Sequence, residues 1–265
     1  MKKTVGFIGC GNMGAALARA VAKSVDGADI LLADLDVAKC EALAEELGAC
    51  VSTAEEIAET AYMIVLGVKP QVMAKTLSPL TGAFAERETP FFFVSMAAGT
   101  AIDKITEAAG EDYPVIRIMP NIPASVGEGM ILWTKNDVLA EDVAFFRSAF
   151  DKAGTLDEIP EGMMDAAAAL SGCGPAFVAL FVEALADGAV ACGVPRDKAQ
   201  LYAEKTVLGT AAYLMKTGTH PAVLKDAVCS PGGTTIAGVE AMETGGFRAA
   251  TSSAVIAAFE KTKKL

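Results

Sequence analysis

The sequence predicts an α/β fold in which an N-terminal, Rossmann-like doubly wound sheet is followed by an all-helical dimerisation domain. Short β-type runs alternate with helical stretches through the first part of the chain. Strand patterns then stop, and the rest reads as a series of apolar helices. A glycine-rich turn between the first strand and the first helix indicates a ligand at the sheet. We therefore expect two domains, residues 1–160 and residues 161–265.

Composition narrows the class of ligand. The chain has 265 residues, 52% of them hydrophobic, and a formal net charge of -11 at pH 7. This acidic balance argues against a nucleic-acid partner and against an anionic membrane surface. An anionic ligand would have to be held by backbone N–H groups and a few placed cations.

The cysteine and histidine content argues against a bound metal. The six cysteines include no C-x-x-C pair and the chain has one histidine, so we expect no metal site. Met1, Lys2 and Lys3 lead directly into a strand pattern, and we expect no signal peptide. Reduced thiols in a cytoplasmic protein are the simplest expectation.

The first expected elements are a strand from Thr4 to Ile8, a glycine turn, and a helix from Ala15 to Ser24. The turn has the G-x-G-x-x-G pattern, and its residues are Gly9, Cys10, Gly11, Asn12, Met13 and Gly14. Between a strand and a helix, such glycines permit the turn, the approach of a pyrophosphate and close helix packing. Phosphate charge would lie at the helix N-terminus. The turn therefore predicts dinucleotide binding.

The second strand bears on which dinucleotide is bound. Ile30 to Ala33 is followed by Asp34, 25 positions after Gly9, close to where an acidic residue holds the ribose hydroxyls. A carboxylate there would repel an added 2′-phosphate, so Asp34 mildly favours NADH over NADPH. In the alternative interpretation, Asp34 simply ends the strand and Asp36 caps the next helix.

Further strands should end at the same edge of the sheet. We expect them over Tyr62 to Val68, Phe91 to Val94, Val115 to Ile118 and Met130 to Thr134. Their alternation with helices implies right-handed crossovers, which place ligands at the carboxyl ends of the strands. The residues expected at such ends are Lys69, Ala97, Ala98 and Asn121. Each of them could instead be an ordinary loop residue.

From about Glu161 onward the pattern is helical. The expected helices are Met163 to Leu170, Pro175 to Ala191, Pro195 to Thr217, Ala222 to Val228, Thr235 to Glu243 and Phe247 to Lys264. Apolar residues repeat at seven-residue spacing along the third of these, at Leu201, Leu208 and Met215. Such helices carry more apolar surface than one copy can cover, so we expect a homodimer or a larger homo-oligomer. Ala166 to Val182 is uncharged, but Gly172, Gly174 and Pro175 interrupt it, which favours a buried helix pair over a membrane span.

One turn in the helical half suits a small carboxylate. Ser230-Pro231-Gly232-Gly233-Thr234-Thr235 precedes an apolar run that begins at Ile236. Pro231 fixes one backbone angle, and the glycine pair allows close backbone approach. The unpaired N–H groups and the dipole of a helix start attract anions. The plainer interpretation is a capped turn between two helices.

The sequence resembles the pyrroline-5-carboxylate reductase family over nearly the whole chain. The motifs that carry the resemblance are the N-terminal glycine turn, Val68-Lys69-Pro70, Ala97-Ala98-Gly99, Met119-Pro120-Asn121, Ser171-Gly172-Cys173-Gly174-Pro175-Ala176-Phe177, and Leu224-Lys225-Asp226 leading to Ser230–Thr235. Cys173 stands where the family often has serine. Ala227 stands where some members have a polar residue near the substrate.

The resemblance implies reduction of 1-pyrroline-5-carboxylate to L-proline by NADPH or NADH, the last step of proline biosynthesis. The implied substrate residues are Ser230, Gly232, Gly233, Thr234 and Thr235. Ser230 and backbone N–H groups would hold the carboxylate, and Thr235, the catalytic candidate, would lie near the ring nitrogen. The cofactor candidates are Gly9 to Gly14, Asp34, Val68, Lys69, Pro70, Met96, Ala97, Ala98 and Asn121.

Two other functions stay open. A β-hydroxyacid dehydrogenase would have a lysine and an asparagine on the helix after the interdomain glycine turn, and Phe177 to Val182 has neither. A non-catalytic sensor of nicotinamide dinucleotides is the other alternative. His220, before Pro221, is expected to be structural. Glu183 and Asp187 are expected on a solvated or interface face rather than as an acid/base pair.

Overall fold

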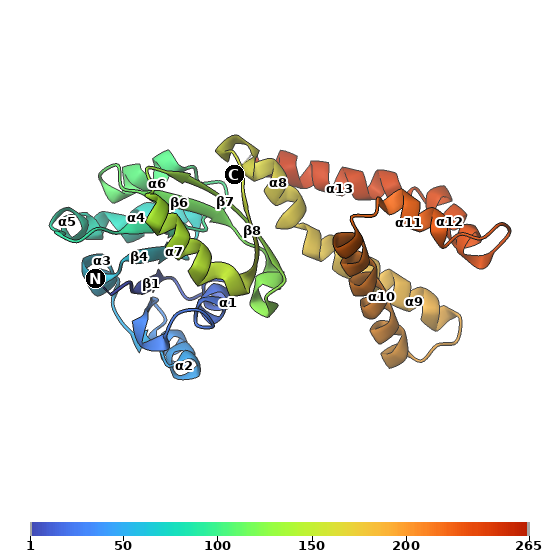
Figure 1. The fold of residues 1–265 in the computed structure, drawn as a ribbon, viewed down its shortest axis with the longest axis horizontal. Coiled ribbons are helices and arrows are strands. Elements are labelled where there is room, and N and C mark those ends of the chain that lie inside the picture. Colours follow the sequence, from blue (N-terminus) through green and yellow to red (C-terminus); the bar gives the residue numbers. More distant parts are fainter. Residues whose placement is uncertain (1, 264–265) are drawn as a thin grey trace. The chain divides into compact units, whose positions relative to one another are not determined.

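A computed structural model of the chain describes residues 2–263. The chain divides into two compact units, Met1–Gly172 with Phe259–Leu265, and Cys173–Ala258. The first, unit 1, contains the sheet, and the second, unit 2, has helices as its regular structure (Figure 1). The predicted domain boundary between residues 160 and 161 marks the end of the strand patterns and stays a prediction.

Unit 1 is built on a sheet that has eight strands within residues 2–263, in the order β3-β2-β1-β4-β5-β6-β7-β8. The strands are β1 (Val5–Ile8), β2 (Ile30–Ala33), β3 (Cys50–Val51), β4 (Met63–Leu66), β5 (Phe92–Ser95), β6 (Val115–Met119), β7 (Gly129–Asn136) and β8 (Gly154–Glu158). Neighbouring strands in this sheet are parallel, apart from the antiparallel pair β6 and β7. The predicted Rossmann-like, doubly wound α/β fold is confirmed.

The sheet departs from the sequence analysis at its two sides. The connection from β6 to β7 spans residues 120–128, which is too short for the crossover that a parallel pair needs, so β7 returns antiparallel. β3 and β8 were not predicted. Both are edge strands: β3 has two exposed residues, and β8 alternates between half-buried and exposed ones. Short strands with little buried apolar surface give a weak sequence pattern.

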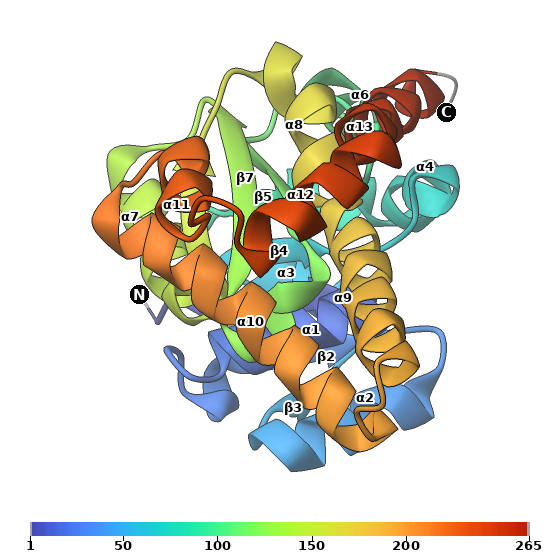
Figure 2. The same cartoon turned by 90° about the vertical axis from the view of Figure 1, so that its right-hand side faces the viewer.

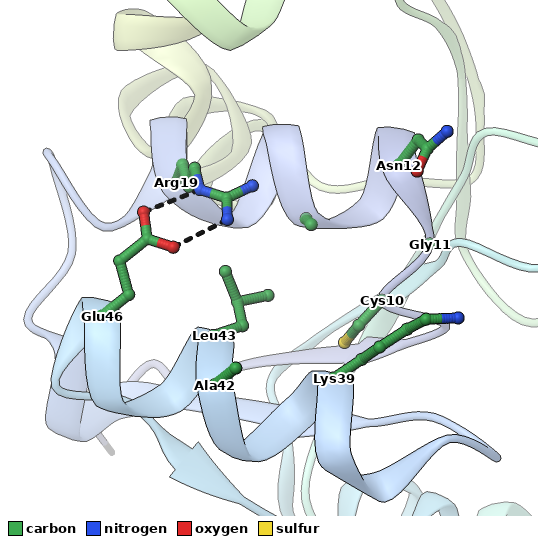
Figure 3. A pocket seen from close by; sticks show the side chains of 9 residues that line it. Cys10, Gly11, Asn12, Arg19, Lys39, Ala42, Leu43 and Glu46 are labelled. Atoms are coloured by element: carbon green, nitrogen blue, oxygen red, sulfur yellow. Dashed lines mark hydrogen bonds and ion pairs between the residues drawn. The ribbon is translucent and has the colours of Figure 1, made fainter.

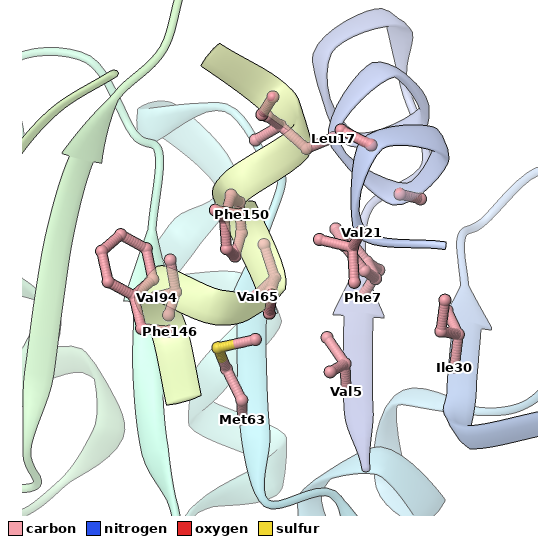
Figure 4. Packing of buried hydrophobic residues seen from close by; sticks show 14 of the residues in the cluster. Val5, Phe7, Leu17, Val21, Ile30, Met63, Val65, Val94, Phe146 and Phe150 are labelled. Atoms are coloured by element: carbon pink, nitrogen blue, oxygen red, sulfur yellow. The ribbon is translucent and has the colours of Figure 1, made fainter. Parts of the chain in front are cut away.

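Helices cover both faces of the sheet in unit 1. They are α1 (Asn12–Val21), α2 (Val37–Leu47), α3 (Ala54–Thr60), α4 (Met73–Leu77), α5 (Thr81–Ala85), α6 (Ile102–Ala109), α7 (Ala140–Phe150) and α8 (Met164–Ser171). Side chains of β4 alternate between two buried clusters: Met63 and Val65 join one, and Ile64 and Leu66 join the other. Figure 4 shows the first cluster, in which α1 and α7 pack on the sheet. A strand buried on both faces explains why β4 reads as a continuous apolar run.

A buried arginine on the sheet forms ion pairs with the start of α8 and the segment before it. Arg117 on β6 pairs with Glu161 at 3.2 Å and with Asp165 of α8 at 3.0 Å. The same Glu161 oxygen accepts a hydrogen bond from the backbone N–H of Ile102 at 2.9 Å. A buried guanidinium needs such charged partners, because an unpaired buried charge is costly. The segment that leads to α8 is therefore held by charge as well as by packing.

Unit 2 consists of α9 (Gly174–Ala191), α10 (Arg196–Thr217), α11 (Pro221–Ala227), α12 (Thr234–Thr244) and most of α13 (Phe247–Thr262). Residue Lys264, at the predicted end of the last helix, lies outside the described residues. α9 and α10 form a helical hairpin with a small core that contains Ala186, Ala199 and Ala203 (Figure 2). The predicted apolar row Leu201, Leu208 and Met215 is exposed on α10 in the single chain. This surface is available for another copy of the chain.

Within the described residues, the segment Glu161–Ala191 is long and apolar enough to cross a membrane by length and composition. The segment contains two helices, because α8 ends at Ser171 and α9 begins at Gly174. Only 11% of its most apolar window is buried inside the single chain. An apolar helix left this exposed needs a cover, and the homo-oligomer expected from the sequence would supply one.

A tyrosine and an aspartate are paired in the core of unit 1. The Tyr62 hydroxyl, just before β4, donates a hydrogen bond to the carboxylate of Asp142 on α7, and both residues are buried. Burial raises the pKa of Tyr62 above its usual value, and the hydrogen bond to Asp142 adds to this effect. The phenol therefore remains a donor well into the alkaline range. Tyr113, in contrast, has a buried hydroxyl with no hydrogen-bond partner in the part of the chain that the structure describes.

The replacement Tyr62→Phe should lower the free energy of unfolding by about 1–3 kcal/mol, since it leaves a buried carboxylate without its donor. Urea denaturation measures this loss. The matched control is Tyr113→Phe, which removes an unpaired hydroxyl and should change stability by about 0.5 kcal/mol or less. Equal losses in the two variants would contradict a stabilising role for the Tyr62–Asp142 hydrogen bond.

Candidate active site

The glycine turn brings β1, α1 and the residue after β4 into backbone contact. Gly9 has a φ of 103°, in the left-handed region that favours glycine. A Cβ on Gly14 would lie 2.2 Å from the carbonyl oxygen of Gly9, and a Cβ on Gly67 would lie 2.3 Å from the same oxygen. Both positions therefore exclude a side chain. Gly67 was not among the predicted site residues, because the expected strand extended to Val68. A glycine inside a strand pattern indicates close backbone approach, and this signal could have identified it.

Gly11 is open where the other turn glycines are closed. A Cβ added at Gly11 would meet no atom within 4 Å. Gly11 is the N-cap of α1. Because glycine has no side chain, no N-cap side chain accepts a hydrogen bond from the first-turn N–H groups of this helix. The helix thus begins at Asn12, inside the turn, and presents its positive end without a side chain in front. This arrangement fits a pyrophosphate, which needs close approach to backbone N–H groups.

Asp34 is locked at the end of β2. The backbone N–H of Cys10 donates to Oδ2 of Asp34 at 2.7 Å, and the backbone N–H of Asp36 donates to Oδ1 at 3.0 Å. Asp36 is the N-cap of α2 but makes no side-chain capping bond. Its carboxylate instead pairs with Lys39 at 3.2 Å. The carboxylate of Asp34 therefore joins the glycine turn to the loop between β2 and α2.

The Cys10 side chain faces the protein interior. Its thiol is buried and lies 3.7 Å from the carbonyl oxygen of Ala33, to which it donates. Burial raises the pKa of Cys10 far above its usual value, and the neighbouring thiol of Cys40 adds to the effect. The thiol thus stays protonated. Any contact that this position makes with a cofactor would come from its backbone.

A groove runs beside the turn, between α1 and α2, and encloses about 410 Å³ (Figure 3). Cys10, Gly11 and Asn12 line one part of it. At another part, Arg19 of α1 and Glu46 of α2 form a bidentate ion pair with two 2.7 Å hydrogen bonds. Lys39 also lines the groove. The cations among these lining residues, Arg19 and Lys39, each have a carboxylate partner.

Backbone hydrogen bonds bring the loops after β4 and β5 to the same edge of the sheet. The N–H of Gly67 donates to Ile8 at 2.8 Å, and the N–H of Met96 donates to Leu66 at 3.3 Å. Pro70 begins a 3₁₀ turn, and the preceding Lys69 is exposed. The predicted residues of the two loops therefore lie after β4 and after β5, at the edge of the sheet where the turn also lies. These residues are Val68, Lys69, Pro70, Met96, Ala97 and Ala98.

Both polar atoms of the Asn121 side chain make hydrogen bonds within unit 1. Asn121 follows β6 and is buried. Its Nδ2 donates to the carbonyl oxygen of Ser171 at 2.9 Å, and its Oδ1 accepts from the N–H of Met130 at 3.0 Å. These bonds give Asn121 a positioning function at the end of α8. Its predicted contact with a cofactor stays a prediction.

The turn Ser230–Thr235 lies in unit 2 and opens α12. Gly232 has a φ of 66°, and the N–H of Gly233 donates to the carbonyl oxygen of Ser230 at 3.0 Å. A Cβ on Gly233 would lie 2.4 Å from the hydroxyl oxygen of Ser230. The hydroxyl can therefore keep this position only while residue 233 has no side chain. Gly233 is the N-cap of α12, and Thr234 and Thr235 are exposed in its first turn. A hydroxyl and uncapped N–H groups thus lie together, as a small carboxylate requires.

Two residues that resemble catalytic groups in the sequence have structural contacts. Nδ1 of His220 accepts from the N–H of Ala222 at 3.2 Å, so His220 caps α11. Asp187 pairs with Arg196 at 2.5 Å on an exposed surface. The predicted structural function of His220 and the surface location of Asp187 are confirmed. In the described part of the chain, no group of histidine, cysteine and acidic side chains could hold a metal ion, and all six cysteines are free.

Comparison with known proteins identifies the family. The profile described as "Pyrroline-5-carboxylate reductase dimerisation" matches residues 161–265, and that described as "NADP oxidoreductase coenzyme F420-dependent" matches residues 4–99. Pyrroline-5-carboxylate reductase from Escherichia coli is 40% identical over 269 residues, which cover 100% of this chain and 99% of the relative. The chain belongs to the pyrroline-5-carboxylate reductase family. The resemblance inferred from the motifs is thereby confirmed.

Two further similarities support this membership. Pyrroline-5-carboxylate reductase from Arabidopsis thaliana is 41% identical over 265 residues, covering 98% of this chain and 95% of the relative. The crystal structure of Plasmodium falciparum pyrroline carboxylate reductase with NADP bound has a TM-score of 0.88 and 31% identity. The match covers 99% of this chain and 98% of that chain. NAD(P)H is accordingly the cofactor of this reductase, and the glycine turn has the geometry to hold it.

Gly14→Ala should abolish NADH and NADPH binding, because the new methyl group would collide with the Gly9 carbonyl and displace the turn. Gly11→Ala is the matched variant: it should leave the free energy of unfolding within about 0.5 kcal/mol of wild type. It should still weaken cofactor binding, since the methyl group would occupy the approach to the first-turn N–H groups. Fluorescence titration with each reduced cofactor measures both effects. Unaltered affinity in Gly14→Ala would refute the packing argument.

Proposed function

We propose that the chain reduces 1-pyrroline-5-carboxylate to L-proline with NAD(P)H, the last step of proline biosynthesis. The observation that carries the proposal is the Ser230–Thr235 turn, where the Ser230 hydroxyl and the start of α12 form a site for a carboxylate. Identity of 40% to the Escherichia coli reductase over the whole chain supports the same reaction. In this proposal the Ser230–Thr235 turn, which could also be a plain helix cap, binds the carboxylate of the substrate.

The reaction needs a hydride at the imine carbon and a proton on nitrogen. NAD(P)H supplies the hydride when bound. If the imine enters already protonated, its nitrogen needs no strong acid from the protein, and catalysis consists largely of positioning. In this proposal Ser230 and the N–H groups of Gly233 and Thr234 hold the substrate carboxylate. The hydroxyl of Thr235 accepts a hydrogen bond from the ring nitrogen and fixes the orientation of the ring.

The dehydrogenase alternative lacks its catalytic residues. Helix α9, Gly174–Ala191, contains neither a lysine nor an asparagine, so the proton relay of a β-hydroxyacid dehydrogenase has no counterpart there. A sensor would have the same fold as a reductase and would differ from it in what happens after the cofactor binds. A sensor would bind the cofactor without oxidising it when the imine is added.

We further propose that the protein acts in the cytoplasm as a homodimer or a larger homo-oligomer, without a nucleic-acid or membrane partner. The dimerisation profile over residues 161–265 supports assembly through the helical half. The exposed apolar row on α10 supports the same surface. The net charge of -11 opposes binding to nucleic acid or anionic lipid. Covering the Glu161–Ala191 segment in the assembly would account for its apolar character.

The decisive assay follows the absorbance of NADH and of NADPH in the presence of purified protein. Oxidation should begin when pyrroline-5-carboxylate is added and should yield proline in equal amount. A reaction mixture without the imine is the control. Binding of the cofactor without oxidation would support the sensor alternative and refute the proposed function.

Thr235→Ala should lower kcat by about 10-fold or more, the factor that corresponds to loss of one hydrogen bond worth about 1.4 kcal/mol in the transition state. Affinity for the reduced cofactor should stay within about 2-fold of wild type. The matched control is Thr251→Ala on α13, where the hydroxyl bonds to its own helix at Phe247. Steady-state kinetics and cofactor titration provide the two measurements. An unchanged kcat would remove Thr235 from the mechanism.

Ser230→Ala should act on substrate binding. The contact between the hydroxyl and the carboxylate is the same in the ground state and in the transition state, so its loss raises KM by about 10-fold and leaves kcat nearly unchanged. Initial rates over a range of imine concentrations distinguish the two parameters. A fall in kcat at constant KM would show that the serine does something other than bind the carboxylate.

A further inference from the structure

We propose that this reductase selects NADH over NADPH, with Asp34 as the specificity-determining residue. The inference rests on the proposed function for its substrate, but it concerns the adenosine end of the cofactor. An acidic side chain at the end of the second strand binds the ribose hydroxyls of NAD, and a nearby arginine accommodates the 2′-phosphate of NADP. The position of Asp34, its hydrogen bonds and the charges around it indicate which case applies here.

The carboxylate of Asp34 is not free to turn away from a ligand. Its two oxygens accept backbone hydrogen bonds from two different segments, Cys10 in the glycine turn at 2.7 Å and Asp36 in the loop before α2 at 3.0 Å. A side chain that could swing outward would admit a phosphate, but rotation here would break both bonds. Each carboxylate oxygen still has a second acceptor site, which is what a ribose hydroxyl needs.

The charges nearby are arranged against a 2′-phosphate. Asp36 adds a second carboxylate two residues on, and Lys39, in the first turn of α2, pairs with it at 3.2 Å. Arg19 is held by Glu46 in a bidentate pair. A 2′-phosphate would therefore meet the fixed carboxylate of Asp34 and the carboxylate of Asp36. The ammonium group of Lys39 is already paired with Asp36. Juxtaposed like charges disfavour binding.

Leu35 occupies the position where a cationic side chain would best stabilise a bound 2′-phosphate. It follows Asp34 directly, and its side chain is fully exposed. An aliphatic side chain offers no hydrogen bond to a phosphate, but it provides an apolar surface for a nucleobase. Because Leu35 makes none of the hydrogen bonds that hold Asp34, it can be replaced without disturbing the carboxylate. This makes Leu35 the better position for a test.

The first measurement is the dissociation constant of NADH and of NADPH, obtained by fluorescence titration of the wild-type protein. NADH should bind at least about 10-fold more tightly, which corresponds to about 1.4 kcal/mol. The ratio of kcat/KM for the two cofactors should favour NADH to a similar degree. Raising the ionic strength should reduce the difference, because salt screens the repulsion between carboxylate and phosphate. NADPH binding as tightly as NADH, or more tightly, would overturn the inference.

The second measurement uses a pair of variants. Leu35→Arg supplies a cation while leaving the hydrogen bonds of Asp34 in place, and it should shift the NADH-to-NADPH affinity ratio toward NADPH by about 10-fold or more. Leu35→Gln, a neutral replacement at the same exposed position, should leave the ratio unchanged. Asp34→Ser should also shift the ratio toward NADPH, provided that thermal unfolding shows the variant to be folded. Identical ratios in Leu35→Arg and Leu35→Gln would contradict the charge argument even if Asp34→Ser does not fold.

These outcomes separate the inference from the proposed function. If neither cofactor is oxidised when pyrroline-5-carboxylate is added, the proposed reaction fails, while the two dissociation constants still report cofactor choice. If the imine is reduced efficiently but NADPH is the preferred cofactor, the reaction stands and the inference about Asp34 fails.

Discussion

The carbonyl group of Gly9 is the constraint on which the cofactor edge of this protein depends. It lies 2.2 Å from the place where a Cβ on Gly14 would be, and 2.3 Å from that of Gly67. Three backbone segments, from β1, α1 and the end of β4, can meet only because none of them carries a side chain there. This close packing sets the N-terminus of α1 directly after the first strand. An uncapped helix start in that place is what makes the edge suitable for phosphate.

Polar contacts extend this arrangement outward. Asp34 ties the turn to the loop before α2 through two backbone N–H groups. On the other side of the sheet centre, Arg117 holds the start of α8 and the segment before it, and Asn121 holds the end of α8. Arg117 and Asn121 are buried and meet their hydrogen-bonding or charge requirements inside unit 1, which is the condition for burying a polar group at low cost. We propose that cofactor selectivity follows from the carboxylate of Asp34, which backbone hydrogen bonds hold in place.

Local patterns in the sequence predicted most of this fold. Where these predictions were wrong or missed an element, there is a physical cause. β2 spans Ile30–Ala33 as expected, because a short buried run with a polar end is unambiguous. α1 begins at Asn12 rather than Ala15, since Asn12, Met13 and Gly14 of the glycine turn also form the first helical turn. The direction of β7 depends on the length of its connection, and β8 has too little buried surface to give a pattern. Asn121 was predicted from its strand-end position, but its bonds to Ser171 and Met130 depend on tertiary contacts that no local pattern contains. The functions proposed for Ser230 and Thr235 rest on the family resemblance, whereas the geometry of their turn follows from glycine and helix chemistry.

The central claim is that the turn before α12 holds the carboxylate of the substrate and product. A crystal structure of the protein with NAD⁺ and L-proline tests it most directly. The account predicts the proline carboxylate within hydrogen-bond distance of the Ser230 hydroxyl and of the N–H groups of Gly233 and Thr234, with the Thr235 hydroxyl beside the ring nitrogen. Proline bound with its carboxylate on other residues, and with this turn free of ligand, would contradict the account.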